Sequence, residues 1–226
     1  MDPHVGIDNV PHRFGKLYCT GKPVLLFAGT GSRQGKFSLQ LEMRDRFIKN
    51  GYCVGQIGTE PSSLLFGMDE VFPSGYGGNI SLSAEDTISL LNLQIHNLEE
   101  KNPDIILVGT QSHILQYNMG NLAFYPLLNY YTLLASDPDG IILCVNYGDP
   151  FEYIKRCIGF LENFIDSKVL AIVVFPIEKD REWKIISQRK ETLDKSKLDE
   201  YIELLKCEIR ISVYTLSDQQ HIDIHT

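Results

Sequence analysis

Short apolar runs alternate along this chain with longer segments in which apolar residues recur every third or fourth position. The runs predict buried strands, and the spaced segments predict amphipathic helices. Strands that alternate with helices favour a parallel sheet, because each parallel connection needs a crossover. We therefore predict an α/β fold of three layers, in which a mostly parallel sheet is covered by helices on both faces. The predicted strands are residues 24–28, 52–57, 105–108, 141–145, 169–175 and 209–214.

Polar residues ahead of the spaced segments predict where helices begin. Ser83, Asp149 and Ser196 each stand where a side-chain oxygen can accept a hydrogen bond from the first helical N–H groups. Pro126 lies within the helical segment predicted at residues 121–135, where it either starts the regular part or kinks it.

Length and composition favour a single domain. The chain has 226 residues, of which 43% are hydrophobic, and this is enough for one α/β core. Residues 1–22 show no strong periodicity and are predicted to be a lead-in segment, and residues 23–226 form the predicted domain. Residues 176–195 are charged and irregular, which favours an insertion.

Charge and cysteine content exclude some functional classes. A net charge of −8 without a basic run argues against non-specific binding of nucleic acid. No apolar stretch reaches the ~18 residues of a membrane-spanning helix, and the N-terminus lacks the pattern of a signal peptide. The five cysteines are odd in number and mostly lie in apolar runs, so we expect reduced core thiols and a cytoplasmic location.

The strand at residues 24–28 leads into a glycine-rich turn, a lysine and a helical segment, P-V-L-L-F-A-G-T-G-S-R-Q-G-K-F-S. This order is typical of a phosphate-binding loop, in which backbone N–H groups line a concave surface and the helix start adds partial positive charge. It predicts a P-loop NTPase-like fold with Lys36 exposed in the empty loop and reaching over phosphate oxygens. The alternative is a plain turn between a strand and a helix. The predicted cofactor-binding residues here are Gly29, Thr30, Gly31, Ser32, Arg33, Gln34, Gly35, Lys36, Phe37 and Ser38.

The loop departs from the usual G-x-x-x-x-G-K-[S/T] pattern. Thr30 stands at the first glycine position, as in the branch of P-loop proteins that includes dethiobiotin synthetase. Phe37 replaces the hydroxyl residue that binds Mg²⁺ in hydrolysing NTPases, while Ser38, about 100° further round the helix, better suits an α-phosphate. The strand that normally ends in a Mg²⁺-binding carboxylate ends here in Gly109. Both usual metal anchors are missing, so we predict no metal site.

Polar residues also follow neighbouring strands, at the edge where open α/β sheets bind ligands. Thr59 and Glu60 follow the second strand, Gln111 and His113 follow the third, and Asn146 ends the fourth. We expect the strands before Glu60 and His113 both to flank the phosphate-loop strand, so that the two side chains converge. The alternative for all these residues is ordinary turn chemistry.

Three features together resemble the P-loop domain of the D-glutamate N-acetyltransferase-like family. They are Gly-Thr-x-x-x-x-Gly-Lys followed by an apolar residue and a hydroxyl, the strand ending near Gln111, and L-L-A-S-D-P-D-G-I-I-L-C-V-N. This family was long classed as a domain of unknown function and is often labelled NAD-dependent epimerase/dehydratase. The resemblance covers roughly residues 23–175 and, more loosely, residues 196–214. It implies an enzyme that uses acetyl-CoA.

The sequence also departs from that family. Family members usually carry an additional N-terminal Rossmann-like domain, where this chain has a 22-residue lead-in. Of the family's glutamate followed by Gly-Gln-Gly-Ser after the third strand, only Gln111 is retained. The family's Gly-Gln-Thr-Gly turn is replaced by Thr59-Glu60-Pro61-Ser62. The substrate and the activity therefore stay open.

Three functional classes fit these observations. An N-acyltransferase would hold the ADP part of acetyl-CoA without a metal and acylate an amine of an amino acid or peptide, with His113 or Glu60 as the base and Asn146 near the adenine. A ligase or kinase of the dethiobiotin synthetase type would bind ATP, with Glu60 as a Mg²⁺ ligand. A non-catalytic protein would keep the nucleotide as a structural or regulatory element. Assembly into a homo-oligomer is compatible with each class.

Overall fold

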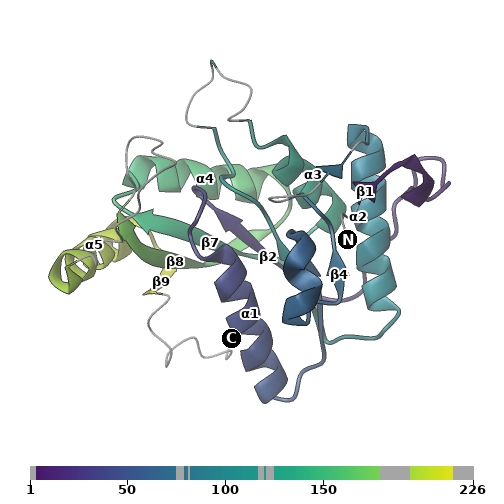
Figure 1. The fold of residues 1–226 in the computed structure, drawn as a ribbon. Coiled ribbons are helices and arrows are strands. Elements are labelled where there is room, and N and C mark those ends of the chain that lie inside the picture. Colours follow the sequence, from purple (N-terminus) through teal and green to yellow (C-terminus); the bar gives the residue numbers. More distant parts are fainter. Residues whose placement is uncertain are drawn as a thin grey trace.

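The structure is a computed structural model that describes residues 4–74, 79–80, 82–116, 120, 125–178 and 194–215. Its main sheet has seven parallel strands in the order β4-β3-β6-β2-β7-β8-β9 (Figure 1). This all-parallel sheet confirms the predicted α/β fold. The strands are β2 (Val24–Gly29), β3 (Val54–Gly58), β4 (Glu70–Val71), β6 (Ile105–Gly109), β7 (Gly140–Tyr147), β8 (Lys168–Glu178) and β9 (Ser212–Thr215).

Five α-helices connect these strands, and two 3₁₀ helices and a small second sheet complete the described elements. The helices are α1 (Lys36–Lys49), α2 (Ala84–Glu99), α3 (Leu127–Ser136), α4 (Phe151–Phe164), α5 (Lys195–Glu208), η1 (Ile7–Asn9) and η2 (Pro61–Phe66). The small sheet pairs β1 (His4–Val5) with β5 (Asn79–Ile80). None of the helices in the described ranges is long and apolar enough to cross a bilayer.

The two faces of the main sheet bury two apolar cores. Side chains alternate along β2, so Leu26 and Ala28 face the larger core, and Leu25 and Phe27 face the smaller one. Helices α2, α3, α4 and α5 contribute to the larger core, whereas α1 covers the smaller one with Leu39, Met43 and Phe47. Helices on both faces give the three layers that the apolar pattern predicts.

The helix starts agree only in part with the predicted caps. Ser83 caps α2 as predicted, because its side chain accepts a hydrogen bond from the Asp86 N–H. Pro126 precedes α3 and so marks the start of the regular helix. The prediction for Asp149 is wrong, since Pro150 occupies the N-cap of α4. The prediction for Ser196 is also wrong, because Asp194 caps α5 by accepting from the Ser196 N–H.

The lead-in packs along α2. Asn92 holds it by accepting from the Tyr18 N–H at 2.7 Å and donating to the Tyr18 carbonyl at 3.1 Å. The His96 ring stacks on the Tyr18 ring with centroids 3.9 Å apart, and the Arg13 guanidinium lies over the same Tyr18 ring. The predicted insertion at residues 176–195 lies mostly outside the described residues, which resume at Asp194 after β8.

The cysteines are less buried than expected. Cys144 and Cys157 lie in the core, but Cys19, Cys53 and Cys207 are exposed. All five are free thiols. The expectation that most of them are core residues is therefore wrong.

Candidate phosphate-binding site

The glycine-rich turn joins the carboxyl end of β2 to the start of α1 at the centre of the sheet (Figure 1). It reverses direction through left-handed backbone at Arg33, with φ of 58°, and at Gly35, with φ of 68°. Gly29 leaves room for the ends of two side chains, because a Cβ there would lie 2.4 Å from Gln34 Oε1 and 2.8 Å from Lys36 Nζ. The local sequence therefore folds into a tight loop around these two side chains.

Lys36 lies folded into the loop. Its ammonium donates hydrogen bonds to the Gly31 carbonyl at 2.7 Å and to the Ser112 carbonyl at 2.8 Å. Only 9% of the residue is exposed, so the expectation of an exposed lysine is wrong. Burial lowers the pKa of Lys36 from 10.5 to about 8. Burial also raises the pKa of the neighbouring Cys144 thiol to about 12, so this thiol is neutral at pH 7.

Gln34 occupies the inside of the loop. Its Oε1 accepts from the Gly31 N–H at 2.9 Å, and its Nε2 donates to the Thr30 hydroxyl at 2.5 Å. A phosphate oxygen would compete with Gln34 for the Gly31 N–H, because such loops bind phosphate through their backbone amides. The side chain of Gln34 thus fills part of the predicted phosphate position.

Asp149, predicted only as a helix cap, is a buried carboxylate beside the loop. It is 3% exposed. Its Oδ2 accepts from the Thr30 hydroxyl and, at 2.9 Å, from the Asn146 N–H. The Thr-for-Gly change at position 30 was the available signal, because a buried hydroxyl there needs a partner. Asp149 is therefore part of the support of the loop.

The positions of the two missing metal anchors are filled by other groups. Phe37 is half-buried, and its ring packs edge-on against Phe66 of η2, with centroids 5.3 Å apart. Ser38 is exposed on α1. Gly109 leaves space that the Gln40 amide fills, since a Cβ at Gly109 would lie 2.9 Å from both Gln40 Nε2 and Oε1. An amide thus stands where a NTPase has its strand-end carboxylate.

A second polar group forms at the ends of β3 and β6. Gln111 Nε2 donates to the Thr59 hydroxyl and, at 3.3 Å, to Glu60 Oε1. Strand β3 pairs with β6 and not with β2, so the expectation that the strand before Glu60 flanks the phosphate-loop strand is wrong. Gln111 follows β6, which does pair with β2, and it bonds to Glu60. Glu60 is therefore linked through Gln111 to the strand next to the phosphate loop.

Asn129 of α3 is a structural residue that was not predicted from the sequence. It is 4% exposed, and its Oδ1 accepts from the Gln111 N–H at 3.0 Å. Its Nδ2 donates to the carbonyls of Gln111 and, at 2.8 Å, His113. A lone asparagine in the apolar segment L-L-N-Y-Y-T-L-L was the signal, because a buried amide needs hydrogen-bond partners. Asn129 fixes the backbone that carries Gln111 and His113.

His113 and Asn146 lie on either side of the loop. His113 forms an isolated antiparallel bridge with Thr30, which places its backbone directly against the phosphate loop. Asn146 lies near the end of β7, the other neighbour of β2, and is 4% exposed. The structure thus gathers residues at or just after the ends of β2, β3, β6 and β7 at one edge of the sheet. Their roles in binding or catalysis stay predictions.

This arrangement can bind an anion through loop amides and Lys36, and it offers Glu60 and His113 as proton acceptors nearby. In the described part of the chain, no group of three or more His, Cys, Asp or Glu residues is placed to hold a metal ion.

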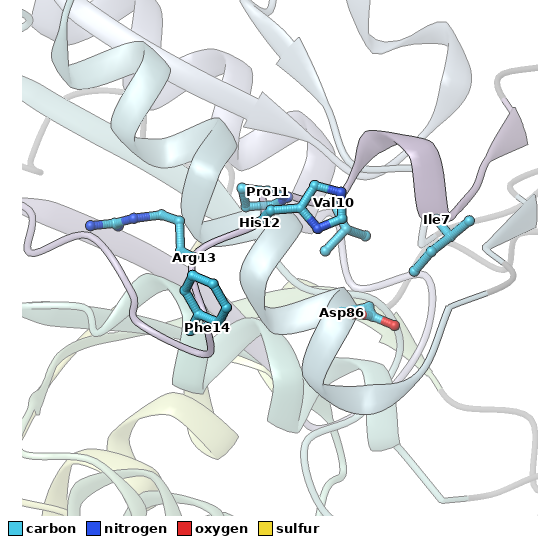
Figure 2. A pocket seen from close by; sticks show the side chains of 7 residues that line it. All are labelled: Ile7, Val10, Pro11, His12, Arg13, Phe14 and Asp86. Atoms are coloured by element: carbon cyan, nitrogen blue, oxygen red, sulfur yellow. The ribbon is translucent and has the colours of Figure 1, made fainter.

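A separate hollow of about 440 Å³ lies between the lead-in and the start of α2 (Figure 2). It contains none of the predicted site residues. Figure 2 shows the Arg13 side chain extending away from Asp86, so the two charges do not converge there. The phosphate loop is the stronger candidate site, because the polar groups converge at that edge. The hollow is lined by Ile7, Val10, Pro11, His12, Arg13, Phe14 and Asp86.

Comparison with known proteins agrees with the P-loop fold. The family model described as a domain of unknown function, DUF1611_C P-loop domain, matches residues 14–222. No curated protein matches the chain in sequence. A crystal structure of a DUF1611 family protein from Anabaena variabilis superposes with a TM-score of 0.65 at 16% identity. The match covers 86% of this chain and 54% of that protein.

Two further solved structures share the fold. Chloroplast FtsY from Physcomitrella patens matches with a TM-score of 0.50 and 15% identity over 92% of this chain and 62% of that one. The signal recognition particle 54 kDa protein from Aeropyrum pernix, solved with GDP, matches with a TM-score of 0.50 and 13% identity over 89% and 43% of the two chains. The matched region therefore spans between 43% and 62% of the length of these proteins. At these identities the likeness shows a P-loop NTPase-like fold and no more.

Proposed function

The chain belongs to the family of DUF1611_C P-loop domains, and from that premise we propose that it is an N-acyltransferase whose loop holds the ADP part of an acyl-CoA. The observation that carries this proposal is the combination of a retained Lys36 with apolar or amide groups at both metal-anchor positions. Phe37 cannot coordinate Mg²⁺, and Gln40 fills the space beside Gly109. A loop of this kind suits phosphates that are bound but not hydrolysed.

Acyl-CoA fits such a loop because its pyrophosphate needs only N–H donors and one cation. The loop amides from Gly31 to Lys36 supply the donors, and Lys36 supplies the charge. Binding requires two local changes. Gln34 must release the Gly31 N–H, and Lys36 must turn from the carbonyls of Gly31 and Ser112 to the phosphate. The thioester arm would then extend along the edge of the sheet.

The transfer step needs a base near the acceptor amine. The neutral amine attacks the thioester carbonyl, so a C–N bond forms and the C–S bond breaks. The base takes the proton that the amine loses and passes it to the departing CoA thiolate, which becomes the free thiol. Glu60, held by Gln111, and His113, beside Thr30, are the proposed bases. A peptide or amino acid amine is the proposed acceptor.

An ATP-dependent ligase or kinase is the second candidate. The observation that favours it is the buried carboxylate of Asp149, which lies next to Thr30 at the start of the loop and offers an oxygen of the type that Mg²⁺ prefers. Its Oδ2 already accepts two hydrogen bonds, so metal binding there would break the support of the loop. A non-catalytic nucleotide-binding protein is the third candidate.

A thermal-shift series separates the three candidates. The protein is melted with CoA, acetyl-CoA, GTP, and ATP with and without Mg²⁺. A ligand at about 100 times its dissociation constant stabilises by ~2.7 kcal/mol, which raises Tm by several degrees. A metal-independent shift with CoA, together with thiol release from acetyl-CoA in the presence of amines, is the expected result. A shift that needs ATP and Mg²⁺ together would reject acyl transfer, and a shift without any turnover would favour the non-catalytic protein.

A further inference from the structure

Three consecutive large apolar residues are exposed on η2. Leu64, Leu65 and Phe66 are 57%, 87% and 55% exposed. Single exposed apolar side chains are ordinary, but a consecutive exposed run on a folded surface is costly unless something binds there. Together with Phe37 these residues form a surface that we call the apolar rim.

The apolar rim stands on a well-anchored turn. Ser63 is fully buried, and its hydroxyl accepts from the Glu60 N–H at 3.3 Å. Gly67 ends the turn with φ of 79°, and Met68 behind it is 3% exposed. Asp69 then pairs with Arg44 of α1 at 2.8 Å. Because contacts fix both ends of the turn, the exposure of its apolar side chains is a property of the folded structure.

The apolar rim also connects the two polar parts of the site. Phe66 contacts Phe37, the residue directly after Lys36, with ring centroids 5.3 Å apart. At the other end of η2, Glu60 precedes the first turn, and its Oε1 accepts from Gln111. A ligand that extends from the phosphate loop past Phe37 would therefore meet an apolar surface and a carboxylate together.

We propose that the acceptor is an amine that carries an apolar group. Its ammonium binds at Glu60, which takes one proton so that the neutral amine can attack, and its apolar group lies against Leu65 and Phe66. That this amine is the acceptor of an acyl group rests on the proposed function. Charge complementarity selects this ligand, since an acidic acceptor would bring its carboxylate against Glu60. The site therefore discriminates against acidic amino acids and in favour of aliphatic or aromatic amines.

Three small probes test the two halves of this site in the presence of CoA. 2-Phenylethylamine carries both features, ethylamine lacks the ring, and 3-phenylpropionate replaces the amine with a carboxylate. Dissociation constants are measured by ligand-observed NMR titration. We expect 2-phenylethylamine to bind at least about tenfold more tightly than either other probe. Equal binding of the three probes would overturn the proposal.

Variants locate the binding. Leu65→Gln and Glu60→Gln should each weaken 2-phenylethylamine about fivefold or more. Leu204→Gln is the matched control, because Leu204 is 51% exposed on α5, far along the sheet from β3. Melting curves verify that each variant is folded. An unchanged affinity of Leu65→Gln for 2-phenylethylamine would overturn the proposal. Sedimentation gives a second test. If the wild-type protein is a dimer and Leu65→Gln is a monomer, a second copy covers the apolar rim and the proposal is overturned.

The same experiment separates this inference from the proposed function. If 2-phenylethylamine binds as expected but no amine releases thiol from acetyl-CoA, acyl transfer fails while the apolar amine site stands. If thiol release occurs with glycine and glutamate as fast as with phenylalanine, acyl transfer stands while the apolar amine site fails.

Discussion

A buried ammonium is costly in a protein, and Lys36 bears this cost while it bonds to carbonyls of the loop. The lowering of its pKa from 10.5 to about 8 corresponds to roughly 3 kcal/mol of disfavour for the charged form in the folded protein. Two carbonyl oxygens, from Gly31 and Ser112, offset part of the lost hydration. A bound phosphate would replace these dipoles with full negative charge. The loop thus holds its cation in an arrangement that a bound anion would stabilise.

Replacing Lys36 separates folding from binding. Lys36→Met keeps the apolar stem and removes the buried charge, so we expect the empty protein to gain about 1–3 kcal/mol of unfolding free energy at pH 7. Urea titration measures this gain. The same variant should show no thermal shift with CoA. A variant that is destabilised and still responds to CoA would contradict both the burial cost and the role of Lys36.

The pKa of Lys36 also predicts a pH dependence of stability and binding. Burial lowers the folded pKa below the unfolded value, so the unfolded chain binds more protons between about pH 8 and 10.5. Below about pH 8 the buried charge of Lys36 lowers the free energy of unfolding by its full amount. Between about pH 8 and 10.5 this penalty is lost, so the free energy of unfolding rises with pH. A bound phosphate keeps Lys36 protonated. CoA binding near pH 9 should therefore be accompanied by the uptake of close to one proton, and binding at pH 7 by almost no proton uptake. Calorimetry of CoA binding in buffers of different ionisation enthalpy measures this number, with Lys36→Met as the control.

At the scale of elements, strand β6 and helix α1 are fitted to each other where a metal-binding carboxylate is usual. Gly109 ends β6 and Gln40 lies on α1, and the amide of Gln40 occupies the space that a side chain at position 109 would need. Gln40 is 2% exposed, and its Nε2 has no hydrogen-bond partner in the described residues. The contact is therefore steric, and the two positions should be coupled.

A double-mutant cycle measures this coupling. Gly109→Ala places a Cβ 2.9 Å from the Gln40 amide, so it should destabilise the protein by about 1–3 kcal/mol. In a protein that carries Gln40→Ala, Gly109→Ala should destabilise by about 1 kcal/mol less than it does in the wild type, because the clash is removed. Gly159→Ala on α4 is the matched control. It meets nothing within 4 Å and should stabilise by up to about 1 kcal/mol. Additive effects at positions 109 and 40 would contradict the packing.

The presence of helices and strands could be predicted from the sequence more reliably than the residues at which helices begin. Apolar periodicity identifies α1 and β2 because burial on one or both faces dictates the spacing. The caps were harder. Asp149 carries a good capping residue type, but its carboxylate bonds instead to Thr30, which is far away in sequence. Local chemistry cannot show which of two partners a carboxylate will meet. Lys36 was misjudged for the same reason, since Ser112 comes from another loop.

At the scale of the whole molecule, sheet order decides which loops share the site. Alternating strands and helices predict a parallel sheet, but many orders satisfy the same pattern, and β3 lies one strand further from β2 than expected. The convergence at the carboxyl edge still holds, because parallel strands end on the same side whatever their order. Glu60 thus reaches the site through Gln111, a contact that sequence alone does not specify.

This arrangement predicts which parts of the molecule a phosphate ligand protects from hydrogen exchange. The loops that follow β2, β3 and β6 lie at one edge, and the turns that precede β3, β6 and β7 lie at the opposite edge. CoA should slow exchange in the first group, because its phosphates bond the loop amides and its arm covers the neighbouring loops. The opposite edge should change little, and Lys36→Met should abolish the effect. Mass spectrometry of peptides resolves the two groups, and protection confined to the lead-in hollow would move the binding site away from the phosphate loop. The protected segments expected are residues 30–36, 58–66 and 110–114, and the unaffected ones are residues 50–53, 100–104 and 137–139.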